Sequence, residues 1–383
     1  LVAFASFGES IASLNGSTTD FDSFRKKFHR SYEVNSEEFS RRQIYFQKAA
    51  VRHLHLNSFS TESQSATYGI NQFADLSQME FRDVYLRAES SSRAPGFAGL
   101  TRTGLPARFD WRDKGVVAPV QNQLACGSCW AFSTVGAVQS VRAMGGLQLE
   151  QLSVQQVLDC SWENQGCNGG SPSRALAWLK QTRVKLVRAS EYPYKAETGA
   201  CHFFSQSHEG VAVKNFTLYS FSGQEEAMMG QLVTFGPLAA VVDAVSWQDY
   251  LGGVIQHHCS SQWSNHAVLV VGYDTTGDIP YWIVQNSWGT TWGDQGYVYV
   301  KIGGNICGIA DSAVKNFTLY SFRGHSLLDC AELLGNGMGG SGLRVCKDRR
   351  QHLRYRRFCG SCFSLTTVCM SHCVWVLPFA KMK

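Results

Sequence analysis

The chain has 383 residues, 44% of them hydrophobic and 12% aromatic, a composition typical of a globular protein rather than a disordered one. This length is enough for two or three domains, and no apolar run reaches the roughly 18–20 residues that a membrane-spanning helix needs. The net charge of +5 arises in residues 323–383, whose ten Lys or Arg and three Asp or Glu give +7, so residues 1–322 carry −2 and the charge does not indicate nucleic acid as a partner.

The thirteen cysteines indicate synthesis along an oxidising route, because so many are unusual in a reduced compartment unless they bind metal. The first six residues resemble the end of a signal peptide, with Ala3 and Ala5 in the small-x-small pattern of a cleavage site. Three Asn-x-Ser/Thr sequons, which fit N-glycosylation on that route, begin at Asn15, Asn215 and Asn316.

Residues 1–104 have the signals of a helical leader. Apolar residues at helical spacing predict a first helix at Phe21, Phe24 and Phe28. A longer helix is predicted with one face at Phe39, Phe46, Ala50 and Leu54. After a short extended piece (68–73), the capping box Ser77-Gln-Met-Glu80 predicts a third helix through Tyr85. Two interpretations remain open, a small helical domain of its own or a segment that serves the rest of the chain.

Residues 90–103 are rich in Ser, Gly, Ala and Arg without periodicity, which predicts an exposed linker where activation cleavage would occur. Residues 105–208 then carry mainly helical signals, including the capping-box pattern Ser153-x-x-Gln156 and a helix from Arg174 to Gln181. From residue 209 the pattern predicts strands at 211–221, 238–245, 267–273, 281–284 and 297–302. We therefore expect an α+β fold with a cleft between a helical half and a β half.

Cys129 is the candidate nucleophile of the helical half. It precedes an apolar, helix-compatible run (130–138), so its thiol would lie at a helix N-terminus, where the backbone N–H groups and the helix dipole favour the thiolate. Gln123, six residues earlier, is positioned to supply an oxyanion donor. The alternative is a structural or redox pair between Cys126 and Cys129.

A thiol nucleophile needs a base and an orienting group, and the β half offers both. His266 opens an apolar strand 137 residues after Cys129, and Asn286 follows in Gln-Asn-Ser-Trp-Gly, 157 residues after Cys129. Alone, His266 is more often a structural histidine and Asn286 part of a turn. Their joint order and spacing favour a Cys-His-Asn site.

With these motifs the chain resembles the papain-family cysteine proteases from about residue 36 to residue 311. The segments 245–253, 256–261 and 307–311 strengthen the resemblance to cathepsin-type members of that family. It implies a papain-like two-domain fold, with a helical left domain and a β-barrel right domain, preceded by a helical inhibitory prosegment. The expected divisions are 1–104 (signal remnant and propeptide), 105–322 (peptidase domain, mainly helical in 105–208 and mainly β in 209–322) and 323–383 (an atypical tail).

The resemblance also gives the leader a function. Its Glu/Arg/Phe/Asn helix motif is present at Glu38, Arg42, Phe46 and Asn57, although Ala49 and His53 replace the Asn and Ile of the family. The second prosegment motif is complete at Gly69, Asn71, Phe73 and Asp75. The resemblance implies that the leader threads backwards through the cleft, bound but not cut. Asp75 and neighbouring carboxylates are expected to anchor the leader while ionised, so that acid releases it.

Substrate binding by family resemblance involves a cleft edge that pairs with an extended backbone, a main side-chain pocket and a tryptophan that covers the His–Asn hydrogen bond. The residues concerned are Asn168, Gly169, Gly170, Ser171, Pro172, Val241, Ser264, Ala267 and Trp288. The disulfides implied by the same resemblance are Cys126–Cys167, Cys160–Cys201 and Cys259–Cys307, which leave Cys129 free.

The tail departs from the family. Residues 313–322 repeat residues 212–221 without a change, and the copied strand is expected to dock on the edge of the barrel. Residues 323–383, Gly-rich, then basic, then Cys-rich, are expected to be disordered or spurious. A zinc-binding tail module is the alternative, with a possible ligand spacing at Cys359, Cys362, Cys369, His372 and Cys373.

The sequence thus predicts a monomeric cysteine endopeptidase with no cofactor or metal. It is expected to be made as a zymogen for lysosomal protein breakdown, and the alternative location is outside the cell. Its expected partners are protein and peptide substrates, its own propeptide and, by resemblance, cystatin-type inhibitors, with neither nucleic acid nor membrane. The alternative is a catalytically silent papain-like binding or inhibitory protein, because the altered C-terminus departs from the family.

Overall fold

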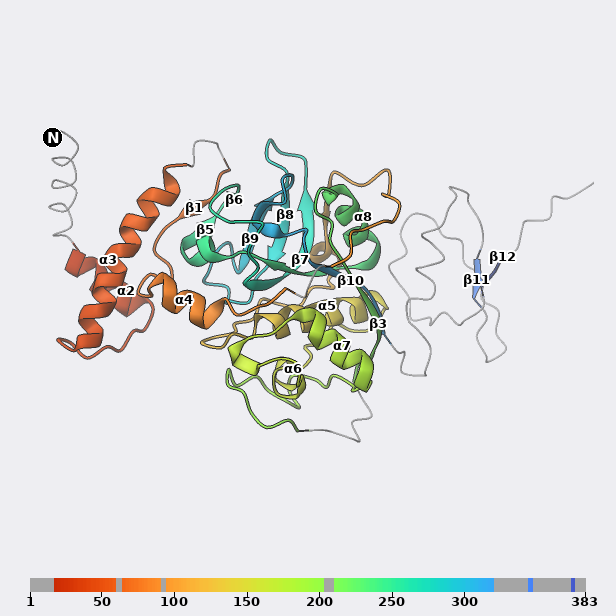
Figure 1. Ribbon diagram of the computed structural model, residues 1–383, viewed down its shortest axis with the longest axis horizontal. Helices are drawn as coiled ribbons and strands as arrows, with labels where there is room; N and C mark the ends of the chain where they lie inside the picture. The colour runs from red at the N-terminus through yellow and green to blue at the C-terminus, as the bar shows by residue number, and fades with distance from the viewer. Residues whose placement is uncertain are drawn as a thin grey trace, which may run out of the picture.

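A computed structural model of the chain describes residues 17–59, 64–90, 94–202, 210–319, 344–346 and 373–375. The leader helices lie on one side of a body made of a helical half and a large sheet (Figure 1). The helices of the leader are α2 (Ser17–Lys27), α3 (Glu37–Asn57) and α4 (Gln78–Tyr85). None of the described helices combines the length and the apolar character needed to cross a bilayer.

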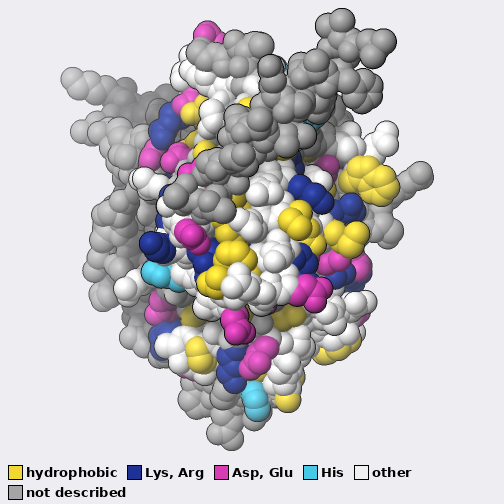
Figure 2. Space-filling view, turned by 90° about the vertical axis from the view of Figure 1, so that its left-hand side faces the viewer, with side chains coloured by type: hydrophobic (Ala, Val, Ile, Leu, Met, Phe, Trp, Pro, Cys, Tyr) yellow, Lys and Arg dark blue, Asp and Glu magenta, His cyan; other side chains and the backbone are white. Residues whose placement is uncertain are grey.

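The leader has a small aromatic core of its own. Phe21 and Phe24 of α2 pack against Phe46 of α3, with ring centroids 5.4 and 5.0 Å away. The buried side of α3 consists of Phe46, Ala49, His53 and Leu56. The predicted face was therefore wrong at Leu54, which is 74% exposed. On the face that carries the leader, Figure 2 shows hydrophobic side chains dispersed among charged ones of both signs.

The N-terminus of α4 confirms the predicted capping box. Ser77 Oγ accepts from the Glu80 N–H and the Glu80 carboxylate accepts from the Ser77 N–H, both close to 3 Å. The extended piece predicted for residues 68–73 is shorter, because only β1 (Thr67–Tyr68) is a strand and turns follow at residues 72–76. β1 pairs antiparallel with β5 (Tyr250–Gly252), so the leader adds a strand to the body.

The helical half contains α5 (Cys129–Met144), α6 (Val154–Cys160) and α7 (Pro172–Thr182). α5 packs against α6, α7 and one face of the sheet, so its residues are buried nearly all round, and Trp130, Val135, Ala137 and Val138 are fully buried. The capping box predicted for α6 is only half formed. Ser153 Oγ accepts from the Gln156 N–H, but the Gln156 amide bonds the backbone of residues 185 and 187 instead.

The eight-stranded sheet runs in the order β3-β10-β4-β7-β8-β9-β6, with β2 paired to β7. All pairs are antiparallel except β6 with β9. The strands are β2 (Arg108–Asp110), β3 (Val213–Tyr219), β4 (Leu238–Val242), β6 (Val254–Ile255), β7 (His266–Asp274), β8 (Tyr281–Gln285), β9 (Tyr297–Lys301) and β10 (Ala313–Leu319). The five strands predicted from the sequence are all present. The sequence did not predict helix α8 (Glu225–Phe235) within the β half, nor β2, β5 and β6.

The copied segment forms β10, and it pairs with the strand that it repeats. Ala313 lies opposite Tyr219, Val314 opposite Leu218 and Leu319 opposite Val213. β10 also pairs with β4, so it lies between β3 and β4, inside the sheet, rather than on its edge as predicted. Ala313, Val314 and Leu319 are buried there.

The predicted linker is anchored to the body around Phe97 and again at Arg102, whose Nη1 donates to Thr234 Oγ1 (3.2 Å). Phe97 is only 8% exposed, its N–H donates to the Ser220 carbonyl (2.9 Å), and its ring packs on Phe221 with centroids 5.0 Å apart. Leu100, by contrast, is 95% exposed. The linker is thus bound to the body before Leu100 and exposed to solvent at Leu100.

Several predicted features lie outside the residues that the structure describes. Of residues 323–383, the structure describes only the backbone of β11 (Arg344–Cys346) and β12 (Cys373–Trp375), which pair with each other. The sequon at Asn15, the signal remnant, the side chain of Asn316 and the tail positions Cys359, Cys362, Cys369 and His372 are all outside. Asn215 is exposed on β3.

Candidate active site

Cys129 is the first residue of α5, fully buried, and the only free cysteine among the described residues between 17 and 319. The preceding Cys126 is bonded to Cys167, so the alternative of a redox pair with Cys129 is wrong. The structure also forms Cys160–Cys201 and Cys259–Cys307, the other pairs implied by the family resemblance. Backbone groups of Ala267, Arg87, Trp130 and Cys129 itself lower the pKa of the Cys129 thiol, and Arg87 belongs to the leader.

His266 begins β7 and is held by Asn286, which follows β8. His266 Nε2 lies 2.7 Å from Asn286 Oδ1, and both side chains are buried. Since the amide oxygen can only accept, Nε2 carries the proton and Nδ1 is the basic nitrogen of the neutral ring. Nδ1 has no hydrogen-bond partner among the described residues. The Trp288 ring lies over the imidazole, with centroids 4.6 Å apart, and screens the His–Asn bond from water.

Gln123 is fully buried and fixed at both ends of its amide. Nε2 donates to the Cys126 carbonyl (2.9 Å), and Oε1 accepts from Ser287 Oγ (2.7 Å). The Tyr194 hydroxyl donates to the Gln123 carbonyl (2.7 Å). No local pattern in the sequence indicates Ser287 or Tyr194, because their contacts with Gln123 join segments far apart in the chain.

The leader crosses this site as an extended segment. The Ala88 N–H donates to the Asn265 carbonyl (2.9 Å), the Glu89 N–H to the Gly170 carbonyl (2.8 Å), and the Gly170 N–H to the Arg87 carbonyl (3.1 Å). The Ala88–Gly170 bridge is parallel. Nearer to Cys129, Gln123 Nε2 lies 3.4 Å from the Tyr85 carbonyl oxygen. Backbone pairing of this kind is how extended peptides bind an exposed edge.

Gly169 permits this close approach. Its φ of +126° is unfavourable for a side chain, and a Cβ there would lie 2.4 Å from the Arg87 carbonyl oxygen. Of the other predicted substrate-binding residues, Val241 and Ala267 pair across β4 and β7 and share an apolar cluster with Ala88. Ser171 is buried and Pro172 opens α7, whereas Asn168 is exposed and Ser264 half-buried.

With the leader in place, burial favours the neutral forms of both Cys129 and His266. Burial raises the pKa of the Cys129 thiol to about 11, although backbone hydrogen bonds oppose the shift. Burial also lowers the pKa of His266 to about 4, against the hydrogen bond that its Nε2–H donates to Asn286. Because excluding water disfavours charged groups, the covered site favours a neutral thiol and a neutral imidazole over a thiolate–imidazolium ion pair.

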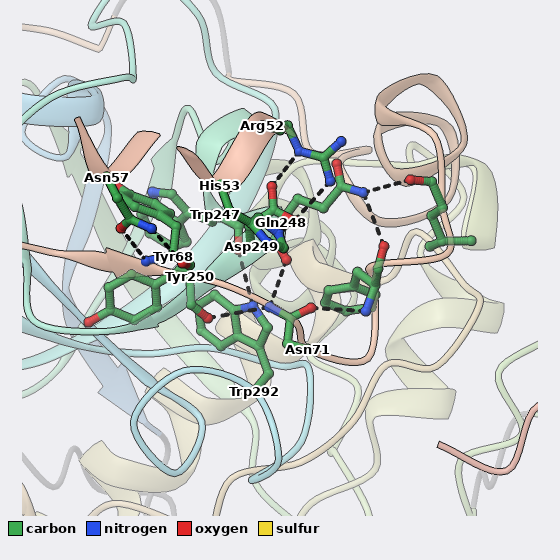
Figure 3. A network of polar contacts seen from close by, with 12 residues as sticks. Arg52, His53, Asn57, Tyr68, Asn71, Trp247, Gln248, Asp249, Tyr250 and Trp292 are labelled. Carbon is green, nitrogen blue, oxygen red and sulfur yellow. Dashed lines mark hydrogen bonds and ion pairs between the residues drawn. The ribbon is translucent and has the colours of Figure 1, made fainter. Parts of the chain in front are cut away.

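A network of polar contacts joins the leader to the body (Figure 3). Asp249, 1% exposed, receives a hydrogen bond from Arg52 Nη2 (2.8 Å), a close contact from Arg52 Nε, and a bond with His53 Nε2 (3.0 Å). Burial would raise the pKa of Asp249, but the bonds from Arg52 and His53 outweigh it and hold that pKa below its usual value. His53, which interrupts the family pattern in the sequence, is thus a partner of the body.

Two further contacts in Figure 3 fix the leader backbone. Asn71 Nδ2 donates to the Gln248 carbonyl (2.8 Å), and Gln248 Nε2 donates to the Leu76 carbonyl (3.0 Å). Asn57, the last residue of the helix motif, forms a reciprocal pair of bonds with the Tyr68 backbone (2.8 and 2.9 Å). The motif residues therefore hold the leader in shape and against the body.

The prediction that Asp75 anchors the leader to the enzyme was wrong in its partners. Asp75 forms an ion pair with Arg30 (3.0 Å) and a short contact with the Tyr32 hydroxyl, and both belong to the leader. Asp75 therefore stabilises the fold of the leader. The buried carboxylate that joins leader to body is Asp249, on the body side.

Within the described part of the chain, no group of three or more His, Cys, Asp or Glu side chains is placed to hold a metal ion. The geometry described above provides a buried thiol, an oriented imidazole and a fixed amide donor. These groups are suited to acyl transfer through a thioester.

The sequence matches two family profiles. Residues 105–317 match the papain family cysteine protease profile, and residues 21–81 match the cathepsin propeptide inhibitor domain. Cathepsin O of Homo sapiens is 56% identical over 277 residues, which cover 71% of this chain and 86% of that protein. Cysteine proteinase B of Leishmania mexicana is 38% identical over 307 residues, covering 77% of this chain and 68% of that protein.

Solved structures of precursors have the same fold. A digestive procathepsin L2 proteinase from the larval midgut of Tenebrio molitor superposes with a TM-score of 0.71 at 32% identity, covering 78% of this chain and 98% of that one. A recombinant stem bromelain precursor gives 0.70 at 32% identity with the same coverage. Both similarities include the leader as well as the body.

Proposed function

The chain belongs to the papain family of cysteine proteases and is a cysteine endopeptidase, and on that premise we propose that it is made as an inactive zymogen whose Cys129, His266 and Asn286 form the catalytic site. The observation that supports this most is the leader segment at residues 85–89, which lies across Cys129 while His266 and Asn286 stay bonded beneath it. The mature enzyme is residues 105–322, and residues 1–104 are removed.

The proposed reaction follows from the positions of these groups. His266 Nδ1 takes the Cys129 proton, and the thiolate attacks the scissile carbonyl carbon. The imidazolium returns the proton to the leaving amine as the C–N bond breaks, which leaves a thioester on Cys129. Water, deprotonated by His266, then hydrolyses the thioester. This step releases the carboxylic acid product and restores the Cys129 thiol. Asn286 holds the imidazole in the required tautomer throughout.

The oxyanion that forms during attack is stabilised by the Cys129 N–H and Gln123 Nε2. Cys129 is the first residue of α5, so its N–H is one of the helix-terminal donors without an intrahelical partner. Gln123 needs little reorganisation because Ser287 and the Cys126 carbonyl already fix its amide. Trp288 covers the His266–Asn286 bond.

The leader inhibits by occupying the cleft. Its bridge to Gly170 is parallel, which agrees with the reversed direction implied by family resemblance, and Ala88 belongs to the same hydrophobic cluster as Val241 and Ala267. In the mature enzyme the substrate-binding residues are those of the body, namely Val241, Ala267, Asn168, Gly169, Gly170, Ser171, Pro172 and Ser264. Cystatin-type inhibitors would compete for the same cleft.

The cysteine count, the disulfides and the exposed sequon at Asn215 support a secretory route to the lysosome, or secretion. This fits the similarity to cathepsin O and a role in lysosomal protein breakdown. Peptide and protein substrates, and the leader itself, are the expected partners of a monomer.

An electrophilic peptide probe tests the assignment. After acid processing, the probe should label Cys129 alone, and Cys129→Ala should abolish labelling and peptide cleavage together. Label on another cysteine would overturn the assignment of the nucleophile. A folded, processed protein that takes no label would instead support a catalytically silent binding protein.

A further inference from the structure

Arg174, in the first turn of α7, lies at the end of the cleft where the leader leaves it. Its Nη2 donates to the Glu89 carboxylate (2.7 Å), and the Glu89 N–H is itself bound to the Gly170 carbonyl. Glu89 is the only carboxylate of the described residues in an ion pair with Arg174. Its side chain therefore occupies a position next to the edge that pairs with an extended peptide.

Asn164 orients Arg174 toward that edge. Asn164 Oδ1 accepts from Arg174 Nε (3.1 Å) and from the Ser171 N–H (2.8 Å), and its Nδ2 donates to Ser161 Oγ (2.8 Å). These bonds lie within the body and do not involve the leader. The guanidinium is therefore fixed from the body side and keeps its place when the leader is removed.

We propose that, in the processed enzyme, Arg174 selects substrates with Glu or Asp at the position that Glu89 occupies. The proposal rests on the proposed function, since it takes the leader segment at residues 87–89 as the occupant of the substrate cleft. The released leader leaves Arg174 without its carboxylate partner, and an acidic peptide side chain restores the pair. The ligand class is an extended peptide with one acidic residue near the scissile bond.

The selectivity should be small and sensitive to salt. The Arg174 side chain is 31% exposed and that of Glu89 54% exposed, so water and ions screen their attraction. Pairs of this kind favour the charged partner by about two- to fivefold in affinity. Arg174 thus modulates the choice among substrates, while the main pocket and the backbone contacts determine binding.

The test compares quenched fluorescent peptides that carry Glu or its neutral isostere Gln at each of the three residues on either side of the scissile bond. For the processed wild-type enzyme at low salt, kcat/KM should be about two- to fivefold higher for Glu at one position only. Arg174→Ala should remove the preference, Arg174→Lys should keep part of it, and Arg174→Glu should reverse it toward Lys peptides. Lys185→Glu, the same charge change at an exposed position outside the cleft, should behave as wild type.

Equal rates for Glu and Gln peptides at every position would overturn the subsite but leave the endopeptidase intact, because the Gln peptides are cut. A preference that persists in Arg174→Ala would also overturn it. Binding provides a readout without turnover: a peptide of residues 78–96 should bind processed enzyme more tightly than its Glu89→Gln variant, and equal affinities would contradict the proposal. Failure of all peptides to be cut would instead count against the proposed function, and the binding comparison would still decide the subsite.

Discussion

At the residue scale, removal of the Gln123 side chain should slow the chemical step without weakening substrate binding. Gln123→Ala should lower kcat by about 100- to 1,000-fold with little change in KM, because the oxyanion donor acts only once the tetrahedral intermediate forms. The measurement is steady-state kinetics on a fluorogenic peptide after processing. Ser287→Ala, which loosens Gln123 but keeps its amide, should cost much less. A Gln123→Ala enzyme within threefold of wild type would contradict the role.

The thiol of Cys129 should respond to pH differently before and after activation. In the zymogen its pKa is raised to about 11 by burial, so iodoacetamide should label it slowly at pH 7 and faster as pH rises. Once the leader leaves, water and the freed His266 favour the ion pair, and labelling should be rapid already in mild acid. Mass spectrometry of the peptide that contains Cys129 measures both profiles. Equal rates at pH 7 would contradict the coupling.

At the scale of elements, the contact of α3 with Asp249 should resist acid. A carboxyl with a lowered pKa contributes fully above its ordinary value of 3.8 and loses that contribution only as pH falls through the lowered value. Asp249→Asn should therefore weaken inhibition by the leader on the order of 100-fold at both pH 7 and pH 5, because Arg52 is left unpaired at a buried contact. Inhibition constants for added leader are the measurement. Glu226→Gln, an exposed carboxylate on α8, is the control.

The expected release of the leader in acid points to histidines at the same interface. The His258 ring lies 6.0 Å from His55 of α3, and it also packs on Phe59 and Tyr68. Burial first, and then the charges of His257 and His55, lower the pKa of His258 from 6.5. A lowered pKa means that this contribution to leader binding is complete above pH 6.5 and falls as pH drops below it.

His258→Phe should therefore reduce the loss of leader affinity between pH 7 and pH 5, while keeping the aromatic packing. Isothermal titration of the added leader at both pH values measures this change. His202→Phe, an exposed histidine of the helical half, should keep the wild-type response. An unchanged pH response in His258→Phe would exclude this histidine as the sensor.

What could be predicted at this scale depended on how far apart the interacting residues lie. The α4 capping box spans four residues, so the sequence predicts it correctly. The contact between Arg52 and Asp249 joins residues 197 apart, and no local pattern indicates it. The spacing of apolar residues predicts the wrong face at Leu54, because Leu54 is exposed, whereas the polar His53 is buried and bonded to Asp249.

At the scale of the whole molecule, the copied strand should matter for stability and the following tail should not. Truncation after Asp311 removes Val314 and Leu319 from buried positions, each worth about 1.5–3 kcal/mol of unfolding free energy. Truncation after Phe322 should leave turnover and the melting temperature unchanged. Thermal melts and peptide cleavage of both variants are the measurements. A loss of activity in the longer variant, or zinc retained in equal amount by residues 323–383, would contradict this view of the tail.

The overall architecture was predictable because each half has its own periodicity and because the Cys, His and Asn motifs are short and contiguous. The structure brings His266 and Asn286 into hydrogen-bond contact, as their order suggested. The position of β10 was less predictable. Its alternating residues indicated a strand, but only the pairing with both β3 and β4 places it inside the sheet.

The pairing of β3 with its own copy creates an ambiguity for the folding chain. Val213 opposite Leu319 and Leu218 opposite Val314 are the same pair of residue types, related by an exchange of the two strands. The exchange does not preserve every pair, because Lys315 lies opposite Thr217 whereas Thr318 lies opposite Asn215, across a register shift. Chain connectivity distinguishes the two copies: β10 begins six residues after Cys307 of the Cys259–Cys307 disulfide, and it is β10 that lies beside β4.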